Sequence, residues 1–193
     1  PCEIPWYIRL PLEGIYTNNL TEPANQGIIA IQLNGVGIYG AQEASGTNAV
    51  EPSSSGGAVQ DAQYWWGHTA PSHDWHYHNP MIGHETQPAS TDLIAYSLDG
   101  YPIYGPVSDV SVLDSCNGRI NEQTGKYQYH VWTLDQVDGT ADYCNGNSPA
   151  IQWNYVLGCY HGSLSKTLVT SNTATQATIP SDCVKVDYSS VFV

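Results

Sequence analysis

The chain has 193 residues and a formal net charge of -13, from five Lys or Arg against eighteen Asp or Glu. A chain so acidic, with no basic run, has no electrostatic attraction to nucleic acid or to an anionic membrane surface, so both are excluded as partners. No apolar stretch approaches the ~20 residues of a membrane-spanning helix, and no leader precedes Pro1, so we expect a soluble, exported chain whose signal has been removed.

Short β-branched and aromatic runs bounded by Gly, Pro, Asn and Asp predict strands, and no helical periodicity lasts for three turns. In chain order the predicted strands are 6–12, 27–33, 36–39, 93–98, 127–134, 151–157 and 184–188. Asn34-Gly35 and Asp99-Gly100 each follow an apolar run and predict hairpin turns, whereas 42–60 predicts a surface loop. The predicted class is all-β: a single sandwich- or barrel-like domain over 1–193, with long surface loops and little or no helix.

The order of motifs along the chain repeats. An apolar run, an Asn/Asp-Gly turn, Ile-Tyr-Gly, a loop with a Gly, and an aromatic segment ending in His occur twice, over about 28–84 and 93–162. Asn34 and Asp99 are 65 positions apart, whereas His78 and His130 are 52 apart, so the second copy has the shorter loop. We interpret the repeat as an internal duplication. Halves that pack face to face would bring His78 and His130 toward one place.

The histidines are concentrated, since five of the seven fall between His68 and His84. His76 and His78 lie two apart, so on a strand they point to the same face, and they can bind one Zn or Cu ion. The repeat adds His130 as a third candidate ligand and His68, at the matching loop position, as a fourth. The alternative is that these histidines only hydrogen-bond to Asp, Tyr and Trp and hold two sheets together.

The cysteines, with fourteen tyrosines and six tryptophans, are typical of an extracellular β protein with structural disulfides. Five cysteines allow at most two internal bridges, which leaves one for a free thiol or a bond to another chain. No Cys-x-x-Cys pair supports a cysteine-based zinc site. Asn19-Leu20-Thr21 is a sequon and predicts glycosylation of Asn19 if the source cell glycosylates.

Six motifs in order resemble the YHYH-domain proteins. They are LNGV (33–36), GH (67–68) leading to WHYH (75–78), DGYPIYGP (99–106), LDSCNGR (113–119), YQYH (127–130) and GCYHG (158–162). The resemblance implies a secreted or surface protein of a family without established activity. It also implies a bridge between Cys116 and Cys159, after which Cys144 would pair with Cys183 or Cys2. The second copy departs from the signature at Gln128, a poor ligand for Zn or Cu.

Several other functions are weighed against the sequence. A copper site built on an N-terminal histidine conflicts with Pro1, no Gly-x-Ser-x-Gly motif supports a serine hydrolase, and no spacing singles out a pair of catalytic carboxylates. The stretch 135–147 offers oxygen ligands for calcium but lacks EF-hand spacing, so an acidic surface loop is favoured. Five tryptophans could pack the core or form a sugar-stacking platform, and the core is favoured. They are Trp65, Trp66, Trp75, Trp132 and Trp153.

Together these observations predict an extracellular structural or binding protein rather than an enzyme. Its terminal segments 1–12 and 184–193, of which the second ends on three apolar residues, would either dock on the chain's own sheet or add to the edge of a second copy, and the latter would make the protein a self-associating cell-surface or filament subunit. A divalent metal, Cu or Zn before Ca, would be an optional stabiliser. The alternatives are a secreted Cu- or Zn-dependent metalloenzyme with an open coordination position facing His68, and a carbohydrate-binding module that binds a glycan.

Overall fold

The computed structural model describes residues 6–24, 26–43, 49, 67–69, 75–78, 87–133, 156–164 and 168–171. These residues form twelve strands and one 3-10 helix, η2 (Val110–Val112), with no α-helix among them. The strands are β1 (Trp6–Arg9), β2 (Tyr16–Thr21), β3 (Ile28–Gln32), β4 (Gly37–Tyr39), β5 (Gly67–Thr69), β6 (Trp75–Tyr77), β7 (Leu93–Ser97), β8 (Pro102–Tyr104), β9 (Gly118–Ile120), β10 (Tyr127–His130), β11 (Tyr160–Gly162) and β12 (Leu168–Ser171). The described part of the chain contains no helix long and apolar enough to span a membrane.

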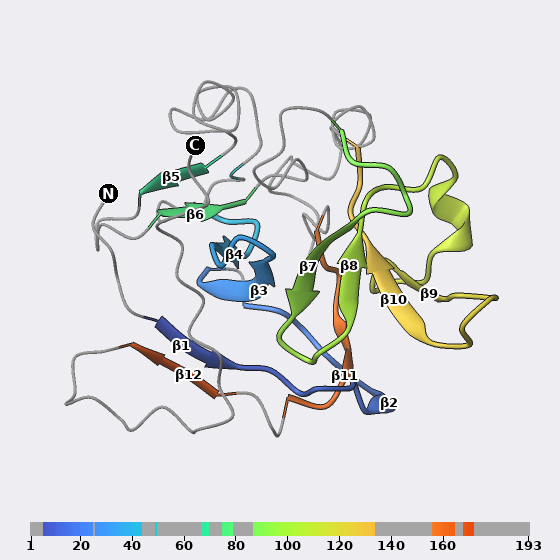
Figure 1. Cartoon of the computed structure of the whole chain (residues 1–193), viewed down its shortest axis with the longest axis horizontal. Coiled ribbons are helices and arrows are strands. Elements are labelled where there is room, and N and C mark those ends of the chain that lie inside the picture. Colours follow the sequence, from blue (N-terminus) through green and yellow to red (C-terminus); the bar gives the residue numbers. More distant parts are fainter. Residues whose placement is uncertain are drawn as a thin grey trace, which may run out of the picture.

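Eight strands form one sheet, in the order β5-β6-β4-β3-β7-β8-β10-β9 (Figure 1). In the first half, β3 and β4 form an antiparallel hairpin, β6 pairs parallel with β4, and β5 pairs antiparallel with β6. In the second half, β7, β8, β10 and β9 repeat these three pairings. The central strands β3 and β7 pair antiparallel, so a pseudo-twofold axis perpendicular to the sheet relates the halves. The prediction of an all-β fold built from two related halves is confirmed.

The halves lie side by side in this sheet, and the prediction that they pack face to face is wrong. His78 directly follows β6 and His130 ends β10, with β4, β3, β7 and β8 between these strands. At a strand spacing of ~4.8 Å, the two histidines are therefore ~24 Å apart across the sheet. The physical reason is that pairing β3 with β7 satisfies the backbone hydrogen-bonding groups along the open edge of each hairpin.

Both predicted hairpin turns are present. Gly35 and Gly100 adopt φ values of 86° and 88°, in the left-handed region that glycine enters without steric cost. The side chain before each glycine accepts a hydrogen bond from the backbone two residues on, at 2.9 Å for Asn34 and 3.4 Å for Asp99. Asn34 also donates to the Tyr77 hydroxyl at 3.0 Å. Each turn is thus held by a local hydrogen bond of its own.

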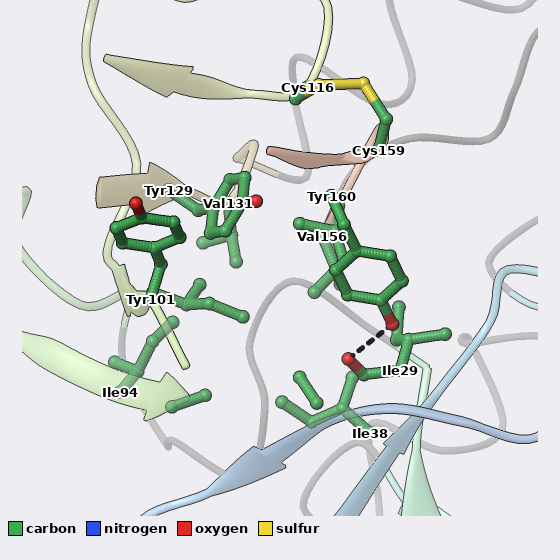
Figure 2. Packing of buried hydrophobic residues seen from close by; sticks show 14 of the residues in the cluster. Ile29, Ile38, Ile94, Tyr101, Cys116, Tyr129, Val131, Val156, Cys159 and Tyr160 are labelled. Atoms are coloured by element: carbon green, nitrogen blue, oxygen red, sulfur yellow. Dashed lines mark hydrogen bonds between the residues drawn. A yellow bond between two sulfur atoms is a disulfide. The ribbon is translucent and has the colours of Figure 1, made fainter. Parts of the chain in front are cut away.

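A second layer covers one face of the sheet and contacts both halves, at Ile29 in the first and at Asp99 and Tyr129 in the second. It consists of β11 paired with β2, and Tyr160 on β11 donates a hydrogen bond to the backbone oxygen of Ile29 at 2.9 Å (Figure 2). The predicted disulfide between Cys116 and Cys159 is present and joins this layer to the segment before β9. The buried residues of the sheet and of the second layer form one core cluster, against which Trp75 and Trp132 pack.

The terminal segments are described only in part. The opening strand β1 pairs antiparallel with β12 of the same chain, so this predicted edge segment docks within the molecule. Cys2, Cys144, Cys183, the acidic stretch 135–147, the predicted strand 184–188 and the apolar tail lie outside the described residues, as do Trp65, Trp66 and Trp153. Asn19 lies on β2 and is exposed, so it is accessible to a glycosylating enzyme.

Candidate metal centre

Three of the four predicted metal ligands meet at one end of the sheet. His68 on β5 lies directly opposite His76 on β6, and His78 follows two residues later on the same side of the chain. Their ring centroids are 4.5, 4.8 and 5.1 Å apart. One nitrogen atom from each of the three rings can be chosen so that all three lie within 4.8 Å of one another. The three side chains are therefore close enough to bind one ion.

The tautomer of His78 is fixed by its backbone contact. Nδ1 lies 2.5 Å from the carbonyl oxygen of Gly40, and only a protonated nitrogen makes that contact, so Nε2 presents its lone pair. Nε2 of His76 lies 3.0 Å away and donates a hydrogen bond to this lone pair, so a bound ion would replace the proton between the two nitrogens. Two nitrogens each ~2.05 Å from a metal ion and 3.0 Å apart would subtend roughly 94° at that ion. This angle lies within the range that transition metals accept.

The environment keeps His78 neutral. Burial, helped by the neighbouring rings of His76 and His68 and opposed by the hydrogen bond to the Gly40 carbonyl, lowers its pKa to about 3. A neutral imidazole is the form that binds a metal ion. At neutral pH the side chain therefore needs no deprotonation before it can act as a ligand.

The cluster is buried on one side and reachable on the other. His76 and His78 are each 3% exposed, and the Tyr39 ring stacks on His76 at a centroid distance of 4.1 Å. The side chain of His68 is 24% exposed, and its Nε2 lies 3.6 Å from a carboxylate oxygen of Glu43. Glu43 can orient this imidazole as carboxylates do around metal-bound histidines.

The equivalent position in the second half is occupied by hydrogen-bond donors. His130 repeats the contact of His78, with Nδ1 2.7 Å from the Gly105 carbonyl oxygen. Its Nε2 lies 2.8 Å from the amide nitrogen of Gln128 and 3.2 Å from Nε of Arg119, the residues that stand where the first half has His76 and His68. Burial lowers the pKa of His130, as does the Arg119 charge, against the Gly105 carbonyl. His130 thus lies outside the cluster and accepts two protein hydrogen bonds.

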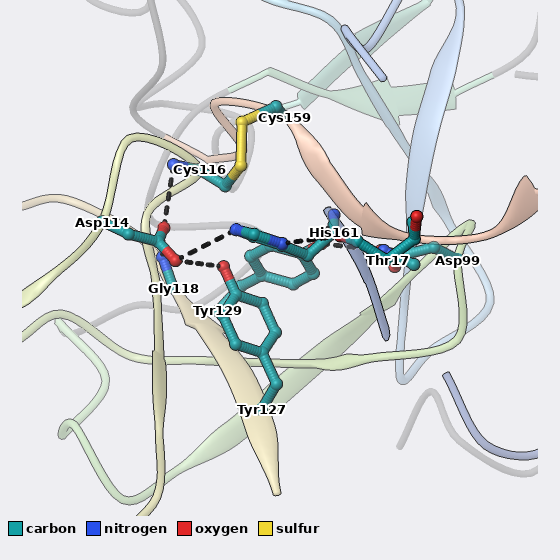
Figure 3. A network of polar contacts seen from close by, with 10 residues as sticks. Thr17, Asp99, Asp114, Cys116, Gly118, Tyr127, Tyr129, Cys159 and His161 are labelled. Carbon is teal, nitrogen blue, oxygen red and sulfur yellow. Dashed lines mark hydrogen bonds and ion pairs between the residues drawn. A yellow bond between two sulfur atoms is a disulfide. The ribbon is translucent and has the colours of Figure 1, made fainter. Parts of the chain in front are cut away.

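A second group of potential ligands does not form a metal site. Asp114, Cys116 and His161 lie close together, but the sulfur of Cys116 belongs to the disulfide and offers no thiolate (Figure 3). The Asp114 carboxylate instead accepts hydrogen bonds from the Tyr127 hydroxyl at 2.8 Å and from the Gly118 backbone at 3.0 Å, with Nε2 of His161 at 3.4 Å. The GCYHG motif contains His161, but its sequence alone does not predict this network.

Comparison with known proteins gives one match. A family model described as YHYH protein matches residues 7–175 of the chain. No curated protein and no solved structure matches it significantly.

Proposed function

The chain belongs to the YHYH protein family, whose model matches residues 7–175, and from this premise we propose that it is an extracellular structural and binding domain that holds one Cu or Zn ion. The proposed ligands are His68, His76 and His78. The ion would link the edge strand β5 to its neighbour β6. Imidazole is a preferred ligand of both metals.

The observation that carries this proposal is the contrast between the two halves. Both place a buried histidine with the same backbone contact and the same tautomer at one position. In the second half its Nε2 accepts hydrogen bonds from Arg119 and Gln128. In the first half two further imidazoles converge there, and the one hydrogen bond that Nε2 of His78 makes is to Nε2 of His76, itself a candidate ligand. A cation in the first half would take the place that the guanidinium and amide fill in the second.

The test is metal binding by protein purified without a His tag. We expect elemental analysis to find one equivalent of Cu or Zn, and calorimetric titration of the metal-free protein to show one site. Saturation at 100 times Kd should stabilise the fold by roughly 2.7 kcal/mol. In His68→Ala the affinity should fall by roughly 100-fold or more, because losing even an outer partner of a ligand costs about 10- to 100-fold.

Arg119→Ala is the matched control, because Arg119 occupies the equivalent strand position in the other half. It should bind metal as the unaltered protein does. The proposal fails if neither ion binds above background, or if His68→Ala and Arg119→Ala bind equally well.

A catalytic metal site is the second candidate, supported by the exposure of His68. Three histidines with a fourth position open to water are the ligand set of catalytic zinc sites. The His68 edge is 24% exposed and Glu43, 18% exposed, lies beside it, so water could reach the ion from this side. Cobalt substitution distinguishes the two roles: a pH-dependent visible spectrum would indicate a bound water and favour catalysis, and a pH-independent one a closed structural site.

Self-association forms part of the same proposal. It is supported by the odd number of cysteines and by the apolar sequence Val191-Phe192-Val193. The extracellular location is supported by the Cys116–Cys159 disulfide. Light scattering should show assemblies of the full chain that are lost when residues 184–193 are removed. A monomer unaffected by this truncation would exclude assembly through the tail.

A further inference from the structure

Four side chains with metal-binding atoms meet where the disulfide joins the second layer to the segment before β9 (Figure 3). Asp114, Cys116 and His161 each place one ligand atom within 4.8 Å of the other two, and Cys159 is bonded to Cys116. Thiolate, imidazole and carboxylate are the groups that bind zinc in proteins. While the bridge is intact, neither sulfur is a thiolate, so the group lacks two of these four ligands.

The imidazole of His161 is held in the orientation that a metal ligand needs. Its Nδ1 lies 3.1 Å from the backbone oxygen of Thr17, and this contact requires a proton on Nδ1, so Nε2 is the nitrogen that can bind an ion. The Tyr16 ring stacks on the imidazole at a centroid distance of 4.6 Å. The Tyr129 hydroxyl accepts a hydrogen bond from the backbone of His161 at 2.8 Å. These contacts position Nε2 before any ion binds.

The distance between Nε2 of His161 and the Asp114 carboxylate matches the distance between two ligands of one zinc ion. Nε2 lies 3.4 Å from Oδ2 of Asp114. A lone pair that faces a carboxylate is repelled by it, so either a proton or a metal ion has to lie between the two atoms. Two ligand atoms that are each ~2.05 Å from a tetrahedral zinc ion lie ~3.35 Å apart. Zinc could therefore replace the proton with no change in this spacing.

The Asp114 carboxylate keeps a lone pair for an ion. Its Oδ1 accepts hydrogen bonds from the backbone of Cys116 at 2.9 Å and of Gly118 at 3.0 Å. Its Oδ2 accepts one from the Tyr127 hydroxyl at 2.8 Å. A carboxylate oxygen has two lone pairs, so Oδ2 can accept from Tyr127 and still bind an ion that His161 faces.

The two cysteines are screened from water. Cys116 is fully buried and Cys159 is 8% exposed. Once the bond between the sulfurs is broken, rotation about each Cα–Cβ bond lets them separate. Thiolates formed here would lie beside the Asp114 carboxylate, and buried negative charges are costly unless a cation pairs with them. Zinc supplies that cation, and its preference for sulfur and nitrogen ligands favours it over calcium or magnesium.

We propose that reduction of the Cys116–Cys159 bridge creates a zinc site with Cys116, Cys159, His161 and Asp114 as its four ligands, and that reoxidation expels the ion. A dithiol supplies two electrons and two protons: it becomes a disulfide, the S–S bond breaks and both cysteines become thiols. Zinc then binds both sulfurs as thiolates and releases the two protons. In the reverse direction a small disulfide takes two electrons from the thiolates and two protons from solvent, the bridge forms again and the ion leaves. This site does not depend on the cluster of three histidines, which lies in the other half of the sheet.

The experiment is a cobalt(II) titration of the full chain after reduction by a water-soluble phosphine, compared with the oxidised chain. The phosphine takes an oxygen atom from water as it reduces the bridge, and it adds no thiol that competes for the metal. A thiolate bound to cobalt gives a near-ultraviolet charge-transfer band that imidazole and carboxylate ligands do not give, so the cluster of three histidines does not contribute to it. We expect the band in the reduced chain and not in the oxidised one. Zinc should displace the cobalt and remove the band, and so should a small disulfide that restores the bridge.

Variants assign the band to these residues. His161→Gln should weaken cobalt binding by roughly tenfold or more, and so should Asp114→Asn, which keeps an acceptor for the two backbone hydrogen bonds and remains informative if His161→Gln does not fold. Ser115→Ala is the matched control, because Ser115 lies between Asp114 and Cys116, is exposed and is not one of the four ligands; it should bind as the unaltered protein does. Cys116→Ser with Cys159→Ser should show no band, which excludes the other three cysteines as its source.

The proposal is overturned if the reduced chain shows no band, if the band persists in the double serine variant, or if both ligand variants bind as tightly as Ser115→Ala. If reduction unfolds the chain, circular dichroism should show that cobalt restores the β-sheet signal together with the band, because metal binding is then coupled to folding. A band that appears without refolding would also overturn the proposal.

Discussion

Asp99 is a fully buried carboxylate held by neutral donors. Its oxygens accept hydrogen bonds from the Ser97 hydroxyl, the Tyr129 hydroxyl at 2.6 Å and the Gly162 backbone at 2.7 Å (Figure 3). Burial raises the pKa of Tyr129, and the Asp99 charge raises it further, so this hydroxyl stays protonated and donates. In the first half Asn34 occupies the equivalent turn position and hydrogen-bonds to Val36 and Tyr77. The extra acceptor capacity of a carboxylate therefore serves the contact with the second layer.

Asp99→Asn should destabilise the fold by about 1–3 kcal/mol, because an amide NH₂ would face the donors that the carboxylate now accepts from. Urea unfolding measures the change. Asn34→Asp is the reciprocal control, and it should shift stability by less than about 1 kcal/mol, since the Tyr77 hydroxyl can turn from acceptor to donor. Equal urea midpoints for the unaltered protein and Asp99→Asn would contradict this role.

His130 should remain neutral in the folded protein at pH values just below the usual histidine pKa, because its own pKa is lowered. Burial is the larger cause of its lowered pKa, and Arg119 adds to it. As the pH falls, His130 therefore binds a proton in the unfolded chain before it does so in the folded protein. The stability that depends on neutral His130 is fully present above pH ~6.5 and is lost as the pH drops below that value. NMR titration of the imidazole, with the urea-unfolded chain as reference, measures the shift. In Arg119→Ala the pKa of His130 should still be lowered, because its burial remains. The same titration midpoint for His130 in the folded and the unfolded chain would contradict the prediction.

At the scale of elements, the hairpins were predictable and several short strands were not. Asn-Gly and Asp-Gly turns act locally, so they identified β3, β4 and β7 before any contact was known. The strands β5, β6, β8 and β9 have three residues each, too few for a periodic pattern, and they exist because a neighbouring strand completes their hydrogen bonds. β2 is exposed along most of its length, so its sequence carries no apolar alternation to recognise.

The matching strand pairs predict that a second metal site can be built. Arg119→His with Gln128→His would place two imidazoles beside His130, whose Nδ1 is already held by Gly105. The backbone register around these residues is the register found around His68 and His76. We expect metal stoichiometry by elemental analysis to rise from one to two equivalents. Gln128→His alone, with Arg119 retained, should leave it at one because the guanidinium charge repels a cation.

At the scale of the molecule, the repeat predicted two related halves but not the axis that relates them. A duplicated sequence is compatible with halves stacked face to face or joined edge to edge, because each half has the same internal hydrogen bonds in both arrangements. The β3–β7 pairing decides between them through contacts between halves, which no local motif encodes. For this reason the sequence grouped His68, His76 and His78, which do cluster in the structure, but also placed with them His130, which lies at the other end of the sheet.

The disulfide ties the second layer to the sheet in one half only, so its removal should separate stability from metal binding. The bridge joins residues 43 positions apart. By restricting the unfolded chain it stabilises the folded protein by up to ~4 kcal/mol. Cys116→Ala with Cys159→Ala should therefore unfold at a lower urea concentration, by about 2–4 kcal/mol of stability. Metal stoichiometry and affinity should be unchanged, because β6, which carries His76, is separated by four strands from β10 and β9, the strands nearest the disulfide. If the double variant loses metal binding while still folded, the two halves are coupled. If its urea midpoint is unchanged, the bridge contributes little to stability. If both predictions hold, the two ends of the sheet act independently.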